Sequence, residues 1–149
     1  HVVKVIASSN SMLYGLKTLK ASGLSLPVIS NVCQALLVTR LVYASQSWWG
    51  ALRQDNITQL QGVLNRAHRW GLSTHRTNFA DIAAKADSNL LSKIVNNTRH
   101  VLHHLLPPPV THTHSLRPRR HQFILPTRSK STKFNFLQRM LFPQRLPAA

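Results

Sequence analysis

The stretch that decides the fold runs from Ser25 to Tyr43 and reads SLPVISNVCQALLVTRLVY. Its apolar residues recur at intervals of three and four, which is the spacing of one face of an α-helix. Ser25 and Pro27 supply a start signal, because the missing N–H of a proline costs little in the first turn of a helix. The pattern therefore predicts a helix of about five turns. Its apolar inner face is formed by Ile29, Val32, Cys33, Leu36, Leu37 and Tyr43.

Similar helical patterns flank this segment on both sides. Gly23 stands where a preceding helix would end, and Asp55 is a suitable N-cap for a following helix that Gly71 would end. The apolar face of the preceding helix consists of Met12, Leu13, Leu16 and Leu19. The apolar face of the following helix consists of Ile57, Leu60, Leu64 and Ala67. Three helices, each with one apolar face, predict a small helical bundle.

A weaker helical pattern continues to about Asn96. Asn78 or Thr77 is placed to cap it, and Asp87 with Ser88 suggests a break within it. Its apolar stripe consists of Ile82, Ala86, Leu90, Ile94 and Val95. No stretch of useful length alternates between apolar and polar residues as a strand would. We therefore predict a mainly α fold.

The composition changes after residue 98. Residues 99–149 contain nine of the 19 Lys and Arg, seven of the eight Pro and no acidic residue. The run Pro107–Pro109 cannot continue a helix and favours polyproline II, although residues 134–142 are apolar enough for one short amphipathic helix. We therefore divide the chain into a helical unit, residues 1–98, and a Pro-, His- and Arg-rich, partly extended and partly disordered extension, residues 99–149.

Net charge is the strongest indication of function. The chain carries 19 Lys and Arg against three acidic residues, a formal net charge of +16. Neither a hydrolase centre of two close carboxylates nor an oxygen-rich Mg²⁺ or Ca²⁺ site is therefore expected from this chain. A chain this basic is expected to bind polyanions, above all nucleic acid, through their phosphates.

The cations best suited to phosphate contacts lie on the predicted helices and in the extension. Arg66 and Arg69 are three residues apart and so share a face of one helix, while Lys17 and Arg40 belong to two others. The candidates in the extension are Arg117, Arg119 and Arg120. An ordinary polar helix face and a solvated tail are the alternatives, and these would need no ligand.

Metal-binding and nucleophile motifs are missing from the sequence. The nine His do not combine with Cys at the short spacings of a zinc site, and no nucleophile elbow or glycine-rich phosphate loop occurs. We therefore expect no catalytic residue, no metal and no cofactor in this chain. The lone Cys33, the lack of a signal-like start and apolar stretches broken by Gln34, Thr39 and Arg40 fit an intracellular protein, cytoplasmic or nuclear, without a membrane span.

Residues 34–45, QALLVTRLVYAS, followed by Trp48–Gly50, resemble the region after the catalytic palm of non-LTR (LINE-type) retrotransposon reverse transcriptases. In that family a similar Leu-x-x-Arg-Leu-x-Tyr-Ala helix leads to a Trp-Gly turn and then to a helix with a basic end, matched here by Asn65–Gly71. Leu13–Lys20 is similar to the preceding thumb helix, and Asn135–Phe142 is similar to the C-terminal ends of such proteins.

This resemblance implies the thumb and C-terminal segment of an RNA-directed DNA polymerase. The Asp-Asp motif that binds the two catalytic metal ions would lie in a palm domain outside this chain, and Asp55, Asp81 and Asp87 match no catalytic position. The implied partners are RNA or an RNA–DNA hybrid, together with the palm of the parent polymerase. The chain itself would not be an enzyme, and the divalent metal would belong to that palm.

Two other classes of protein fit the same charge. One is a stand-alone basic structural or RNA-binding protein of a ribonucleoprotein. The other is a cationic membrane-surface protein, for which Leu137–Phe142 with Arg139 offers an amphipathic segment. The bases are spread along the chain rather than gathered on one strong amphipathic face, which favours nucleic acid.

Overall fold

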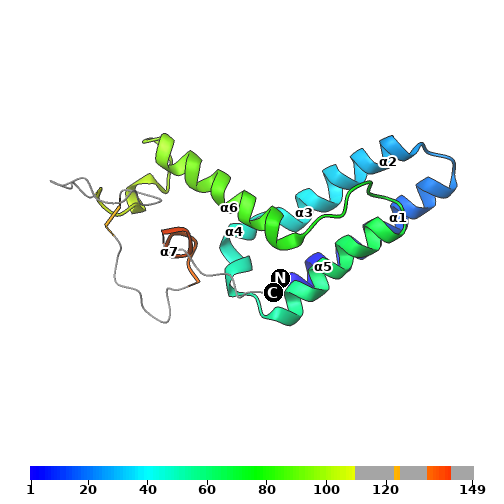
Figure 1. Ribbon diagram of the computed structural model, residues 1–149, viewed down its shortest axis with the longest axis horizontal. Coiled ribbons are helices and arrows are strands. Elements are labelled where there is room, and N and C mark those ends of the chain that lie inside the picture. The colour runs from blue at the N-terminus through cyan, green and yellow to red at the C-terminus, as the bar shows by residue number, and fades with distance from the viewer. Residues whose placement is uncertain (110–122, 125–133, 142–149) are drawn as a thin grey trace. The chain divides into compact units, whose positions relative to one another are not determined.

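The computed structural model describes residues 1–109, 123–124 and 134–141 (Figure 1). Their regular elements are all helices, and an isolated antiparallel bridge joins Pro109 to Phe123. The predicted mainly α fold is therefore confirmed. The chain forms two compact units, His1–Ala86 and Asp87–Ala149, and their division falls inside a helix.

The first unit is built around α1 (Val2–Ala21), which contacts α5 (Gln54–Arg69) and a second, composite helix (Figure 1). The composite helix consists of α2 (Leu26–Cys33), the π-helical turn η1 (Gln34–Val38) and α3 (Thr39–Val42). The buried residues of the three helices are Leu13, Leu16, Ile29, Cys33, Leu37, Leu41, Leu60, Val63, Leu64 and Ala67. The three predicted helices are thus confirmed.

The π turn explains the pattern of burial along the composite helix. Ile29, Cys33, Leu37 and Leu41 are all buried, at a strict spacing of four residues. In a regular α-helix, that spacing would drift by about 120° around the axis over twelve residues. The extra residue in η1 removes about 100° of this drift, so the row stays on one face. The prediction of Tyr43 on the inner face is wrong, because Ala44 turns the chain there and leaves the Tyr43 side chain 75% exposed.

Glycines end α1 and α5 in the same way. Gly23 and Gly71 have φ of +89° and +64°, a left-handed conformation that costs glycine little. After α5, the Gly71 N–H donates to the His68 carbonyl and the Leu72 N–H donates to the Ala67 carbonyl, at 2.9 and 3.0 Å. These two bonds form a Schellman motif, so the predicted role of Gly71 is confirmed.

The start of α5 differs from the sequence prediction by two residues. Arg53, in extended conformation, is the N-cap, and Asp55 lies inside the first turn instead. The Asp55 carboxylate still suits this position, since the N-terminal end of a helix carries partial positive charge. It also forms an exposed ion pair with Arg53, at 3.4 Å. Its contribution to stability is small, because exposed pairs are screened by water.

Two short helices separate α3 from α5: α4 (Ser45–Trp48) and the 3₁₀ turn η2 (Trp49–Ala51). The Trp48 ring stacks near Phe79, with 6.2 Å between ring centroids. Its indole N–H donates to the Tyr43 carbonyl at 3.3 Å. Trp48 therefore fixes the turn after α3 to the core of the unit.

The helix α6 (Phe79–Asn96) begins where the sequence predicts. The Asn78 side chain accepts a hydrogen bond from the Ala80 N–H at 2.9 Å, which is an N-terminal cap. Gln61 of α5 adds a second acceptor, for the Phe79 N–H at 2.8 Å. The suggested break at Asp87 is wrong: α6 runs through it, and Asp87 lies on the buried face.

The second unit pairs Asp87 with Arg139 of α7 (Phe136–Leu141), which confirms the short helix predicted within residues 134–142. The Arg139 Nη2 lies 2.7 Å from the Asp87 Oδ2, and the two side chains are only 9% and 3% exposed. Arg139 also donates to the Phe134 carbonyl at 3.1 Å. Between α6 and α7 in the sequence lies the turn η3 (His103–Leu105). There His103 donates from Nδ1 to the Ile94 carbonyl at 2.7 Å.

Within the described residues, Leu26–Ala51 is long and apolar enough to cross a membrane by length and composition alone. This segment is weak evidence for a span, since a core helix passes the same test. Here it supplies the row from Ile29 to Leu41 to the helical core, and it turns at Ala44. The expectation of no membrane span is not contradicted.

We expect opposite effects from two glycine-to-alanine substitutions at α5. Gly71→Ala should destabilise the protein by about 1–2 kcal/mol, because alanine is strained at positive φ. Its Cβ would also lie 2.6 Å from the Lys20 Nζ. Gly62→Ala, inside α5 with open space around it, should stabilise by about 0.5–1 kcal/mol. Urea unfolding followed by circular dichroism measures the free energy of unfolding of both variants. Equal changes would contradict the left-handed conformation of Gly71 and the helical conformation of Gly62.

Breaking the buried ion pair should release α7. Asp87→Ala leaves the Arg139 guanidinium buried without its carboxylate, a change that typically costs about 3–5 kcal/mol. Hydrogen exchange at the Arg139 amide, which bonds to the Asn135 carbonyl, should then accelerate strongly. Asp81→Ala, at an exposed position of the same helix, is the control and should leave that exchange rate unchanged.

Candidate nucleic-acid interface

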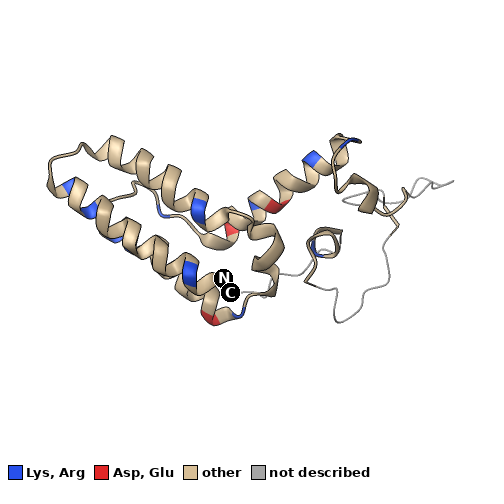
Figure 2. Ribbon diagram, turned by 180° about the vertical axis from the view of Figure 1, so that it is seen from behind, with Lys and Arg blue, Asp and Glu red and all other residues tan. Residues whose placement is uncertain are grey.

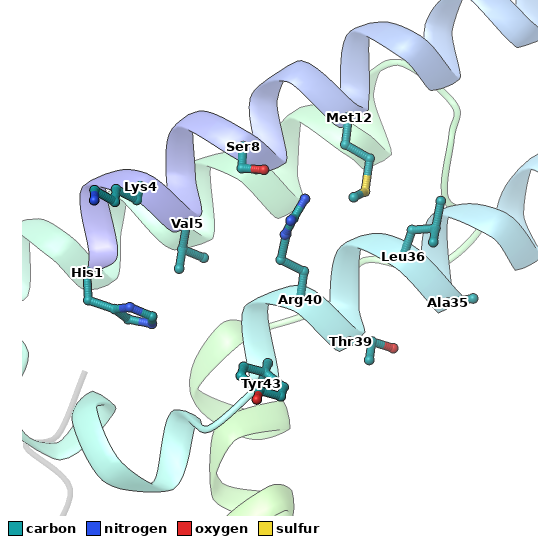
Figure 3. A pocket seen from close by; sticks show the side chains of 10 residues that line it. All are labelled: His1, Lys4, Val5, Ser8, Met12, Ala35, Leu36, Thr39, Arg40 and Tyr43. Atoms are coloured by element: carbon teal, nitrogen blue, oxygen red, sulfur yellow. The ribbon is translucent and has the colours of Figure 1, made fainter.

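An open groove of about 740 Å³ lies between α1 and the η1–α3 part of the composite helix (Figure 3). Arg40 projects from α3 into the space beside α1, and Lys4 stands on the first turns of α1. The lining residues are His1, Lys4, Val5, Ser8, Met12, Ala35, Leu36, Thr39, Arg40 and Tyr43. We call this set the Arg40 groove.

The register of the two helices places these side chains. On α1, Lys4, Ser8 and Met12 recur every four residues and so lie along one side. On the composite helix, Leu36 and Arg40 each directly precede a residue of the buried row, Leu37 and Leu41. The groove therefore borders the core: the positions next to the buried row are held rigidly, while their side chains reach solvent.

The charge of the Arg40 groove is uncompensated by carboxylates. None of its ten lining residues is Asp or Glu, whereas Lys4 and Arg40 are both exposed cations. The ion pairs formed between described residues, Arg53–Asp55 and Asp87–Arg139, involve neither of them. Figure 2 shows Lys and Arg on the helices of the first unit, with few acidic positions among them.

Of the other predicted helix cations, Lys17 lies on a different side of α1, whereas Arg66 and Arg69 belong to α5. Lys17 and Asn10 are turned by roughly 150° around α1 from Lys4 and Ser8. Arg66 of α5 donates a short hydrogen bond to the Asn10 side chain, and Arg69 is exposed in the last turn of α5. Arg40 is thus separate from Lys17, Arg66 and Arg69, so the four do not form one cluster.

Trp70 contacts two side chains of α1. The Lys17 ammonium lies 5.2 Å from the Trp70 ring centroid, a cation–π arrangement, and Tyr14 contacts the ring edge-on with centroids 5.4 Å apart. Lys20 donates from Nζ to the carbonyls of Trp70 and Gly71, at 2.8 and 3.3 Å. Lys20 therefore caps the negative end of α5, a structural role.

Sequence reasoning missed Lys4 and the role of Tyr43 as an exposed aromatic. The signal for Lys4 was its four-residue spacing to Ser8 and Met12, but only the packing of α1 shows which side of that helix stays open. The predicted residues Arg117, Arg119 and Arg120 lie outside the described residues. Phe134, beside α7, is described and exposed.

The described part of the chain holds no group of three or more His, Cys, Asp and Glu side chains that could bind a metal ion. Two histidines of the second unit bond to the backbone instead. His103 donates to Ile94, and the Nδ1 of His100 accepts from the Leu102 N–H at 3.1 Å. These contacts give both rings a structural role.

Cys33 is placed in the core, away from any reactive position. Its side chain is 2% exposed, and burial raises the pKa of its thiol above the ordinary value. Both effects lower the concentration of accessible thiolate, the nucleophilic form. Cys33 is therefore a packing residue of the buried row.

The native protein should react slowly with Ellman's reagent at pH 8. Unfolding in urea should accelerate the reaction by at least tenfold, because it exposes the thiol and returns its pKa to the ordinary range. The time course of absorbance for native and unfolded protein measures this directly. Equally fast reaction of the native chain would show that Cys33 is accessible.

No family model, curated protein or solved structure matches the chain. The resemblance to LINE-type reverse transcriptases therefore stays a prediction that rests on the quoted residues.

Proposed function

We propose that this chain binds nucleic acid through its phosphates, with little dependence on sequence. The observation that carries the proposal is the Arg40 groove, an open groove with two exposed cations and no acidic lining residue. Phosphate contacts by Lys and Arg release condensed counterions, so they favour binding without reading the bases.

The overall charge supports the same conclusion. A net charge of +16 creates a long-range attraction for polyanions that is independent of fold. Lys17 and the exposed Arg69 add to this long-range attraction. Arg66 contributes less, because its guanidinium is engaged with Asn10. We therefore assign phosphate binding at the groove to Lys4 together with the predicted Arg40.

The resemblance to LINE-type reverse transcriptases supplies a biological setting for this activity. On this proposal the chain is the thumb and C-terminal segment of an RNA-directed DNA polymerase. It holds a primed template without carrying the catalytic centre, and an RNA–DNA hybrid is its expected ligand. The second candidate, a membrane-surface protein, predicts binding to anionic vesicles instead.

Charge reversal in the Arg40 groove tests the proposal. The full chain carrying Lys4→Glu and Arg40→Glu should bind a labelled, primed RNA–DNA hybrid more weakly than the wild type. The slope of log affinity against log salt should fall by about 1.4–1.8, because two phosphate contacts are lost and each contributes roughly 0.7–0.9. Fluorescence anisotropy over a series of salt concentrations measures both quantities.

The control carries Lys85→Glu and Lys93→Glu, two exposed positions of α6 with the same total change of charge. Its slope should stay closer to that of the wild type. Equal losses in the two variants would mean that the groove is not the binding surface. Absence of binding at low salt, or binding to anionic vesicles alone, would overturn the proposed function.

A further inference from the structure

Tyr43 is an exposed aromatic residue that lines the Arg40 groove. It lies at the C-terminal end of α3, at one end of the groove, and is 75% exposed (Figure 3). A large aromatic ring in water forgoes the stabilisation that burial would provide. Its position is therefore informative, because the ring lines the same groove as Arg40 instead of lying in the core.

The backbone that carries Tyr43 is held from two sides. Its N–H donates to the Thr39 carbonyl at 2.9 Å, and its own carbonyl accepts from the Trp48 indole at 3.3 Å. The next residue, Ala44, has a φ of 51°, which turns the chain sharply. The phenol ring is thus presented to solvent from a fixed support, so little backbone freedom is lost when a ligand packs on it.

The lining of the groove combines apolar and cationic parts. Val5, Met12 and Leu36 supply apolar surface, while Lys4 and Arg40 supply charge. An inorganic anion would use the charge alone. A nucleotide uses both, since its base is flat and largely apolar on its faces and its phosphate is anionic.

We propose that the Arg40 groove binds unpaired nucleotides, with a base stacked on Tyr43 and the adjoining phosphates at Lys4 and Arg40. This inference rests on the proposed nucleic-acid binding and specifies the form of the ligand. A groove of about 740 Å³ is in the range of small-ligand sites, roughly 300–1,000 Å³. A duplex can only lie across its mouth, because paired bases keep their faces stacked inside the helix.

Four variants of the full chain test this ligand preference. The probes are a labelled oligo(U) RNA of about 10 nucleotides and a blunt duplex of the same length. Tyr43→Ala should weaken binding of the single strand by about five- to 150-fold, the range for loss of one stacked base. Binding of the duplex should change by no more than about twofold. Tyr43→Phe keeps the ring and should retain single-strand affinity.

Tyr14→Ala is the matched control. Tyr14 is also exposed, but it lies on the other side of α1 against Trp70. It should leave single-strand binding within about twofold. The fourth variant, Tyr14→Phe, matches Tyr43→Phe. Circular dichroism melting of all four variants reports whether each is folded.

The outcomes separate the two proposals. If the wild type binds both probes with a steep salt dependence but Tyr43→Ala weakens both alike or neither, the stacking site is overturned and nucleic-acid binding stands. If the wild type binds neither probe at low salt, both proposals fail. Selective loss of single-strand binding in Tyr43→Ala alone supports the inference.

Discussion

The burial of one row of side chains, from Ile29 through Cys33 and Leu37 to Leu41, is the constraint on which the first unit depends. Over the twelve residues of this row, a four-residue repeat drifts around a regular α-helix. The wider π turn η1 removes most of that drift and keeps the row on one face. Without it, Leu41 would rotate out of the core by about 100°. Arg40 would rotate with it, so the same turn that completes the core also places the guanidinium at the groove.

The distribution of charge follows from the scarcity of acidic residues. Asp87 is used inside the second unit for Arg139, and Asp55 is paired locally with Arg53. Among the described residues, Lys20 donates to carbonyls at the end of α5, Lys17 lies over the Trp70 ring and Arg66 donates to Asn10. Lys20 stabilises the end of α5, whereas Lys4 and Arg40 have no such structural partner among the described residues. This difference separates cations that hold the fold from cations that are available to a ligand.

Much of the local structure could be predicted from the sequence, because its signals are local. Gly23 and Gly71 end helices by their own conformational freedom, and Asn78 caps α6 with its own side chain. The π turn could not be predicted, since it arises from the fit of the row from Ile29 to Leu41 against α1. The sequence suggests a helix break at Asp87 because nothing local shows its partner, Arg139, which lies 52 residues away. The predicted cations do not share one surface, because net charge indicates only the kind of ligand. Which side of each helix remains open to a ligand is decided by packing.

The most direct test of the central claim, that the folded helical unit binds nucleic acid at the Arg40 groove, is photo-crosslinking. The full chain would be crosslinked to a single-stranded RNA containing 4-thiouridine, and the modified peptides identified by mass spectrometry. Binding at the groove should give crosslinks at Tyr43 and in the first turns of α1, which disappear at high salt. Crosslinks confined to residues 110–133 would contradict it, because binding would then belong to the basic extension and the helical unit would have no part in it.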